Sequence, residues 1–237
     1  MNKGDNNAQL ISIDAKRRIA SDIREMSRNE CVGIHYQHDQ DNILHAKAAI
    51  FGIEDTPYWH GIFLFEIEYS NDYPYSPPLI TFINYGSRYR LHPNIYTSGK
   101  VCLSVLNTWP VGRPWNSCMT IKSVLINIQS VLTANPIVHE PGIPFNHPEA
   151  EAYTEITRYV CLKENFIDHF RRNFLGFSFI KELADKYLAE HKHELEQYFK
   201  QLCKNCPRTE ISVKIYGINL NVNYEKLMND FTTLSCR

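Results

Sequence analysis

The sequence predicts an α+β fold, with a core domain over residues 8–150 and a helical extension over residues 151–237 that packs on or follows the core. Three observations predict it. Apolar residues recur at helical spacing near the N-terminus, four strand-like segments follow, and helical spacing returns after residue 120. Connections this short hold no crossover helix, so the strands are expected to form an antiparallel meander with helices before and after it.

The first helix is expected over residues 8–28, because Ala15, Ile19, Ile23 and Met26 recur at intervals of three or four. Four strands are then expected, over residues 33–37, 43–51, 63–69 and 79–83. Between Phe63 and Tyr69 every second residue is aromatic or aliphatic. The intervening residues are Leu64, Glu66 and Glu68, so this strand is expected to bury one face.

Two irregular segments interrupt this pattern. Three prolines over residues 72–78 cannot donate ladder hydrogen bonds, which indicates a stiff, extended loop. From Gly86 to Gly112 there is no sustained periodicity. A long irregular segment inside a compact domain is more often functional than idle, so the candidate site is expected there.

Helical spacing is clearest from Ile121 to Leu132, and the pair Asn135-Pro136 is expected to end that helix. Further helices are expected over about 149–174 and 177–203. From Thr209 the alternation predicts a strand or a hairpin, followed by a short helix at 224–231.

Composition excludes several classes of partner. The formal net charge is −1, so no overall charge draws the chain to nucleic acid. No apolar run approaches the roughly 20 residues of a membrane span, and the polar N-terminus is unlike a signal peptide. Seven cysteines, an odd number at irregular spacing, favour reduced thiols. We expect no nucleic-acid or membrane partner, and a cytoplasmic or nuclear location.

Cys102 is the cysteine of interest in the irregular segment. A deprotonated thiol is a nucleophile, and the amide of Asn94 can donate to a developing oxyanion. Taken alone, the apolar neighbours Val101 and Leu103 favour an ordinary buried cysteine. Spacing by itself does not decide between these interpretations.

The wider pattern does decide. The tripeptide His92-Pro93-Asn94 precedes Cys102 by eight residues, counted from Asn94. Other marks follow in order along the chain: Thr56-Pro57-Tyr58-Trp59-His60-Gly61, Asp72-Tyr73-Pro74-Tyr75-Ser76-Pro77-Pro78, Trp115 and Asn135-Pro136. From about Ala15 to Gly142 the sequence therefore resembles the ubiquitin-conjugating enzyme (E2) family, which implies its UBC fold.

The resemblance implies a reaction. Cys102 would accept ubiquitin, or a ubiquitin-like modifier, from an E1 activating enzyme as a thioester, and pass it to a substrate lysine or to an E3 ligase. Asn94 would stabilise the oxyanion or hold the loop around it. His92 and Pro93 would be structural, the imidazole bonding local backbone to place Asn94. No metal or small-molecule cofactor is implied.

Lysine must lose a proton to attack, and its free pKa of about 10.4 leaves almost none unprotonated at neutral pH. The segment after Asn135-Pro136 departs from the common family form. His139 or Glu140 is the candidate for this role, with an ordinary surface loop as the alternative. The additional residues 107–114 between Cys102 and Trp115 resemble the larger E2 branch, which has an extended loop there.

The resemblance also assigns partner surfaces. By position, Tyr75, Asn116 and Ser117 would bind E3 ligases, Lys16, Arg17 and Arg18 would bind the E1, and Ile126 and Ser130 would contact the donor modifier. A solvated face is the ordinary interpretation of such basic residues.

Two other functions and one metal site are the alternatives. A non-enzymatic adaptor with this fold would be expected to lack the cysteine, and a cysteine protease would need a base oriented on Cys102. The pair Cys203 and Cys206, even with His191 or His193 nearby, supplies only half of a tetrahedral zinc site, so no metal is expected.

Overall fold

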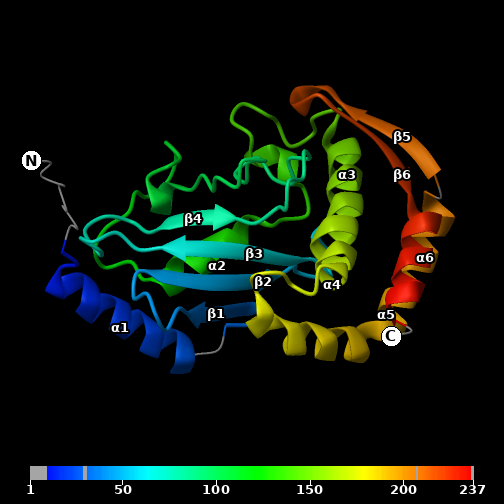
Figure 1. Ribbon diagram of the computed structural model, residues 1–237. Helices are drawn as coiled ribbons and strands as arrows, with labels where there is room; N and C mark the ends of the chain where they lie inside the picture. The colour runs from blue at the N-terminus through cyan, green and yellow to red at the C-terminus, as the bar shows by residue number, and fades with distance from the viewer. Residues whose placement is uncertain (1–9, 29–30, 207, 236–237) are drawn as a thin grey trace, which may run out of the picture.

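The computed structural model describes residues 10–28, 31–206 and 208–235. The predicted meander is confirmed: one sheet runs in the order β1-β2-β3-β4 with every neighbouring pair antiparallel. Its strands are β1 (Ile34–His38), β2 (His45–Phe51), β3 (Ile62–Glu68) and β4 (Leu79–Phe82). Helices come before and after the sheet (Figure 1), so the fold is α+β.

Helix α1 (Ile13–Arg28) starts later than the sequence pattern predicts. The hydroxyl of Ser12 accepts a hydrogen bond from the N–H of Ala15 at 3.0 Å, which satisfies one of the free donors at the helix start. Residues 8 and 9 of the predicted helix lie outside the described residues. The central helix α2 (Ile121–Val131) begins at a capping box made by Thr120 and Ser123, as the clear spacing from Ile121 indicates.

One face of the sheet forms the main core with α2. The cross-strand pairs Ile50–Phe63 and Phe65–Phe82 lie on this face. They belong to the same buried cluster as the inward side chains of α2, which are Val124, Leu125 and Ile128. Burial of this continuous apolar face is the main source of stability for the sheet.

The C-terminal residues form helices and a hairpin. Helix α3 (Ala150–Leu162) passes through one π-helical turn (Lys163–Ile167) into α4 (Asp168–Arg171), where the predicted helix 149–174 is interrupted. Helix α5 (Lys181–Asn205) follows a 3₁₀ turn. A hairpin, one of the two predicted alternatives, pairs β5 (Arg208–Val213) with β6 (Ile218–Asn223), and α6 (Tyr224–Ser235) follows the hairpin.

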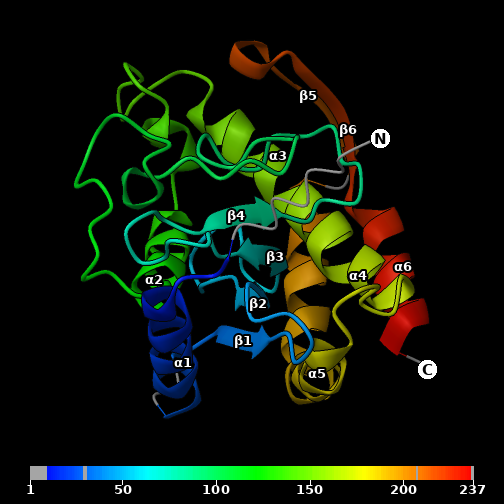
Figure 2. The same cartoon turned by 60° about the vertical axis from the view of Figure 1, so that its left-hand side comes forward.

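The hairpin lies beside α3, with which both of its strands make contact. Figure 1 and Figure 2 show it on the side of α3 away from the sheet, far from α1. The main buried cluster joins Tyr58 and Phe63 of the sheet region to Leu195, Phe199 and Phe231 of the C-terminal helices. The C-terminal residues therefore pack on the core.

Part of the second face of the sheet is also buried, which the prediction of one buried face in the third strand missed. Ala49, Phe51, Ile62 and Leu64 pack with residues that follow α4, namely Phe174, Phe177, Ile180 and Ala184. The burial of Leu64 was not predicted, because Leu64 alternates with Glu66 and Glu68 and the residues that cover it are remote in sequence. No helix in the described part of the chain is both long and apolar enough to cross a membrane.

Candidate functional site

Cys102 and Asn94 are held together by two hydrogen bonds between neighbouring irregular strands. The N–H of Cys102 donates to the carbonyl oxygen of Asn94 at 2.8 Å. The side-chain Nδ2 of Asn94 donates to the carbonyl oxygen of Cys102 at 2.7 Å. Both residues are buried, with 3% and 4% of their surface exposed. The amide of Asn94 is thus directed at the backbone that carries the thiol.

His92 forms a hydrogen bond within the same loop. Its Nδ1 accepts a hydrogen bond from the N–H of Asn94 at 3.0 Å. Burial, and then the neighbouring ring of His139, hold the pKa of His92 well below its ordinary value. The imidazole is therefore neutral at physiological pH, and Nδ1 is free of a proton to accept this bond. The carbonyl oxygen of Pro93 accepts a bond from the guanidinium of Arg90.

The residues after Cys102 fold back on it. Thr108 Oγ1 accepts from the N–H of Leu103 at 2.9 Å and donates to the carbonyl of Val101 at 3.0 Å, which ties the backbone on both sides of the cysteine. Gly112 has a φ of +110°, and a Cβ atom there would lie 2.5 Å from Oγ of Ser104. The additional residues 107–114 therefore pack against the segment of the thiol.

His139 and Glu140 lie beside this loop, and each has a partner. The ring of His139 is 4.9 Å from that of His92, and its Nε2 is 3.1 Å from Oγ1 of Thr133. Burial lowers the pKa of His139. The carboxylate of Glu140 accepts from the hydroxyl of Tyr216 at 2.7 Å. Tyr216 was missed by sequence reasoning, because it lies in the C-terminal hairpin with no local signal.

The residues expected to bind E1 and E3 enzymes lie on connected elements. Trp115 Nε1 donates to the carbonyl of Pro74 at 2.8 Å, which joins the proline-rich loop to the loop of Asn116 and Ser117. Tyr75 is 66% exposed, and Asn116 and Ser117 are exposed. Arg18 bonds to the carbonyl of Ser117 at 2.8 Å, so α1 is attached to the same loop.

The three basic residues of α1 differ in their surroundings. Lys16 and Arg17 are exposed, whereas Arg18 also donates to the buried carboxylate of Asp22 at 3.0 Å. On α2, Ile126 is 42% exposed and Ser130 is exposed, on the side away from the core residues of that helix.

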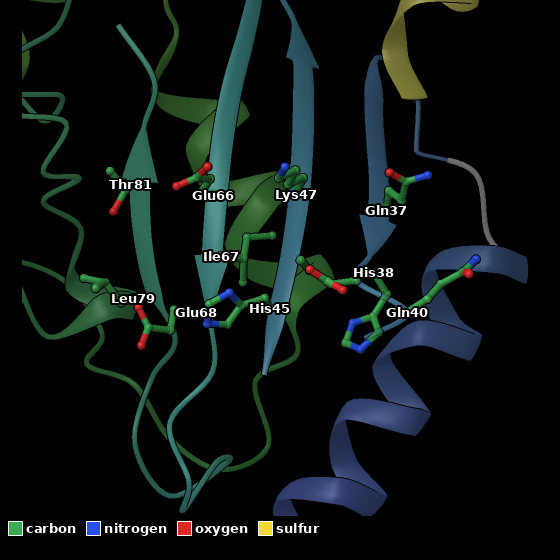
Figure 3. A pocket seen from close by; sticks show the side chains of 12 residues that line it. Gln37, His38, Gln40, His45, Lys47, Glu66, Ile67, Glu68, Leu79 and Thr81 are labelled. Carbon is green, nitrogen blue, oxygen red and sulfur yellow. The ribbon is translucent and has the colours of Figure 1, made fainter. Parts of the chain in front are cut away.

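Within the described residues, neither a metal cluster nor the pocket on the sheet involves Cys102. Nowhere in the described part of the chain do three His, Cys, Asp or Glu side chains gather as a metal ion requires. A pocket of about 450 Å³ lies on the part of the sheet that the C-terminal residues leave uncovered, lined among others by Lys47, Glu66 and His45 (Figure 3). Its lining contains no cysteine, so it is separate from the surroundings of Cys102.

Comparison with known proteins agrees with the geometry. The model of the ubiquitin-conjugating enzyme family matches residues 18–160, more than half of the chain, and includes Asn94 and Cys102. The chain belongs to the ubiquitin-conjugating enzyme family. Ubiquitin-conjugating enzyme E2 Z of Danio rerio is 39% identical over 149 residues, which cover 62% of this chain and 45% of that protein.

Two further family members differ in length. Ubiquitin-conjugating enzyme E2 3 of Arabidopsis thaliana is 34% identical over 148 residues, 62% of this chain and 90% of that protein. The probable ubiquitin-conjugating enzyme E2 R521 of Acanthamoeba polyphaga mimivirus is 30% identical over 210 residues, 82% of this chain and 14% of that protein. The chain spans less than half the length of the E2 Z relatives. Their similarity agrees with the expected placement in the larger E2 branch.

Proposed function

We propose that this protein is an E2 enzyme that accepts ubiquitin or a ubiquitin-like modifier from an E1 as a thioester on Cys102. The observation that carries the proposal is the pair of hydrogen bonds between Asn94 and Cys102, inside the segment that matches the family. The bond from the Asn94 amide brings a side-chain N–H donor next to the residue that carries the thiol. A nucleophile that forms a tetrahedral intermediate does need a donor beside it.

The reaction has two acyl transfers. In the first, the thiolate of Cys102 attacks the carbonyl carbon of the E1 thioester, and the E1 thiolate leaves. In the second, a lysine amine, or a cysteine of an E3 ligase, attacks the new thioester and Cys102 leaves as thiolate. Cys102 is only 3% exposed, and the loop 107–114 packs against Ser104, two residues after it in the chain.

Asn94 holds the loop before it acts on the acyl group. Its Nδ2 is engaged by the carbonyl of Cys102, while its Oδ1 is buried without a hydrogen-bond partner among the described residues. Contact with an oxyanion would require Nδ2 to exchange this bond for one to the intermediate. The side chain of Asn94 could therefore fill both roles that the family resemblance allows. It would hold the loop while bonded to the carbonyl of Cys102, and stabilise the oxyanion when bonded to the intermediate.

Removal of the lysine proton falls to His139 or Glu140. The lowered pKa of His139 keeps its ring neutral at pH 7 and able to accept a proton. Glu140 instead accepts a hydrogen bond from the hydroxyl of Tyr216, and its Oε2 lies 3.6 Å from Nη2 of Arg90. Discharge of the thioester to free lysine across pH, with His139→Gln and Glu140→Gln, separates the two: loss of the true acceptor changes the pH profile.

The partners are the modifier, an E1, E3 ligases and protein substrates, in the cytoplasm or nucleus and with no nucleic acid or membrane. For E3 ligases we propose the surface of Tyr75, Asn116 and Ser117. Lys16, Arg17 and Arg18 would meet the E1, where Arg18 acts by holding the loop of Ser117. Ile126 and Ser130 would contact the donor modifier.

The deciding experiment mixes the purified protein with an E1, ubiquitin and ATP, followed by gels with and without reductant. We expect a reductant-sensitive band larger by one ubiquitin, absent in Cys102→Ala and retained in Cys118→Ala, which removes an exposed cysteine. Absence of the band with ubiquitin and with a panel of ubiquitin-like modifiers and their E1 enzymes would refute the enzyme and favour the adaptor. Release of hydrolysed modifier without conjugates would favour the protease.

A further inference from the structure

The C-terminal hairpin is anchored next to the loop of Asn94. The backbone N–H groups of Lys214 and Ile215, in the turn between β5 and β6, donate to the carboxylate of Glu149 at 2.9 and 3.2 Å. These bonds lower the pKa of Glu149, as expected for a carboxylate that accepts from backbone donors. The ring of Tyr216 packs 5.0 Å from that of Tyr153 on α3. The position of Tyr216 is therefore fixed by the start of α3.

From this position Tyr216 contacts two groups of the core. Its hydroxyl donates to Oε2 of Glu140 at 2.7 Å, and its ring centre lies 4.9 Å from the guanidinium carbon of Arg90. The same guanidinium lies 3.9 Å from the ring centre of Tyr96 and has Nη2 3.6 Å from Oε2 of Glu140. Two aromatic faces and one carboxylate thus hold the guanidinium of Arg90 in place.

Arg90 in turn holds the peptide unit that precedes the side chain of Asn94. Its Nη2 donates to the carbonyl oxygen of Pro93, on one side of the Pro93–Asn94 peptide bond. On the other side of that bond, the N–H of Asn94 donates to Nδ1 of His92. The hydroxyl of Tyr153 fixes the backbone of Arg90 with a bond of 2.8 Å to its carbonyl oxygen. The plane of the peptide is therefore held from both edges.

We propose that Arg90 and Tyr216 are positioning residues for acyl transfer, through which the C-terminal hairpin sets the orientation of Asn94 beside Cys102. This inference rests on the proposed function. Neither residue touches the reacting sulfur; their effect passes through the Pro93–Asn94 peptide to the amide that donates to Cys102. The hairpin thus supplies part of the transfer site although it lies outside the residues that the family model matches.

The choice of arginine supports a positioning role. A planar guanidinium stacks on aromatic rings while its N–H groups donate in its plane, and an ammonium group is a point donor that cannot do both. Arg90 uses both properties, toward Tyr96 and Tyr216 and toward Pro93. Lysine at this position keeps the charge and loses the fixed geometry, so Arg90→Lys separates charge from orientation.

The test is single-turnover discharge of preformed thioester to free lysine, measured over a range of lysine concentrations. We expect Tyr216→Ala and Arg90→Lys to lower the maximal discharge rate roughly 10-fold to 100-fold, the scale of a small misplacement near a reacting group. The lysine concentration at half-maximal rate is expected to stay unchanged. The rate of charging by the E1 is expected to stay within about twofold of the rate of the unchanged protein, because the E1 contributes catalytic groups of its own to that step. Tyr216→Phe keeps the ring against Arg90 and is expected to recover most of the rate.

Two control variants come from the same extension. Ile215→Ala alters the same turn without changing the backbone bond to Glu149. Tyr224→Phe removes a tyrosine-to-carboxylate bond of the same kind, to Glu155 on α3 at 2.6 Å. Both are expected to discharge at the rate of the unchanged protein.

Discharge at the unchanged rate by Tyr216→Ala and Arg90→Lys would overturn the inference and leave the proposed function intact. The inference would also be overturned if Arg90→Lys, Tyr216→Ala and Tyr216→Phe all lost charging rate, discharge rate and melting temperature to the same degree. That pattern marks a purely structural role. Failure of the unchanged protein to form any thioester is a different result, because it removes the proposed function itself.

Discussion

At the scale of single residues, the surroundings of Cys102 depend on contacts that leave little space. Gly112 is the clearest case, because its φ of +110° and its approach to Ser104 both require the absence of a side chain. Thr108 and Asn107 complete the same turn: Asn107 Oδ1 accepts from the N–H of Trp115 at 2.9 Å. The loop 107–114 is thus closed on itself by Asn107, and Thr108 ties its start to the segment that carries the thiol.

We predict that Gly112→Ala slows charging of Cys102 several-fold, because the added methyl group must displace Ser104 or the loop itself. Gly176→Ala is the matched control: its φ of +78° is also unfavourable for alanine, yet no atom lies within 4 Å of the added Cβ. Both variants are expected to lose about 1–2 kcal/mol of unfolding free energy from backbone strain. Equal charging rates in the two variants would show that the approach to Ser104 has no role.

At the scale of elements, α1 is connected to the loop after Trp115 by one side chain. Arg18 donates to the carbonyl oxygens of Ser117 and Met119 and forms an ion pair of 3.0 Å with Asp22. Asp22 is buried, and burial raises its pKa despite the bonds it accepts. The carboxylate therefore depends on Arg18 for its charge partner, and the loop depends on Arg18 for its attachment to the helix.

We predict that Arg18→Ala lowers the free energy of unfolding in urea by about 3 kcal/mol, the scale for removal of one partner from a buried ion pair. Arg17→Ala, one residue away on the exposed side of α1, is expected to change it by less than about 0.5 kcal/mol. Similar urea midpoints for the two variants would contradict this account of α1.

At the scale of the whole molecule, the sheet and the C-terminal helices share a buried histidine. His60 follows Trp59, whose ring stacks on it at 4.3 Å, and its Nδ1 is 2.8 Å from the hydroxyl of Tyr187 on α5. Burial lowers the pKa of His60 to about 3. His169, also buried, has its pKa lowered by burial to about 4. Both rings are neutral in the folded chain at physiological pH.

These shifts predict that stability falls as pH falls below 6.5. In the unfolded chain both histidines bind a proton near pH 6.5, while the folded chain excludes it until about pH 4 or 3. Between these limits each contributes a loss of about 1.4 kcal/mol per pH unit. We expect His60→Gln to flatten the dependence of urea midpoints on pH between 6.5 and 4.5. An unaltered slope in His60→Gln would contradict the assignment.

Much of the fold was determined by the sequence alone, because the signals are local. The alternation from Phe63 and the spacing from Ile121 report burial on one side of a single element, and the meander follows from short connections. The spacing of Asn94 and Cys102 alone left an ordinary buried cysteine as an alternative, and the ordered series of family motifs around them selected these two residues. Eight residues of irregular chain suffice to fold back, so that the side chain of Asn94 meets the backbone of Cys102 through bonds between neighbouring strands.

Tertiary structure alone decided how the C-terminal residues complete the molecule. The second face of the sheet is buried at Leu64 only because the residues after α4 return to cover it. The hydrogen bond of Tyr216 to Glu140 and its ring contact with Arg90 join parts of the chain that share no local pattern. Periodicity records whether a residue is buried, and it does not record which distant segment buries it. That information arises only when the hairpin docks on α3 and brings Tyr216 to the loop of Asn94.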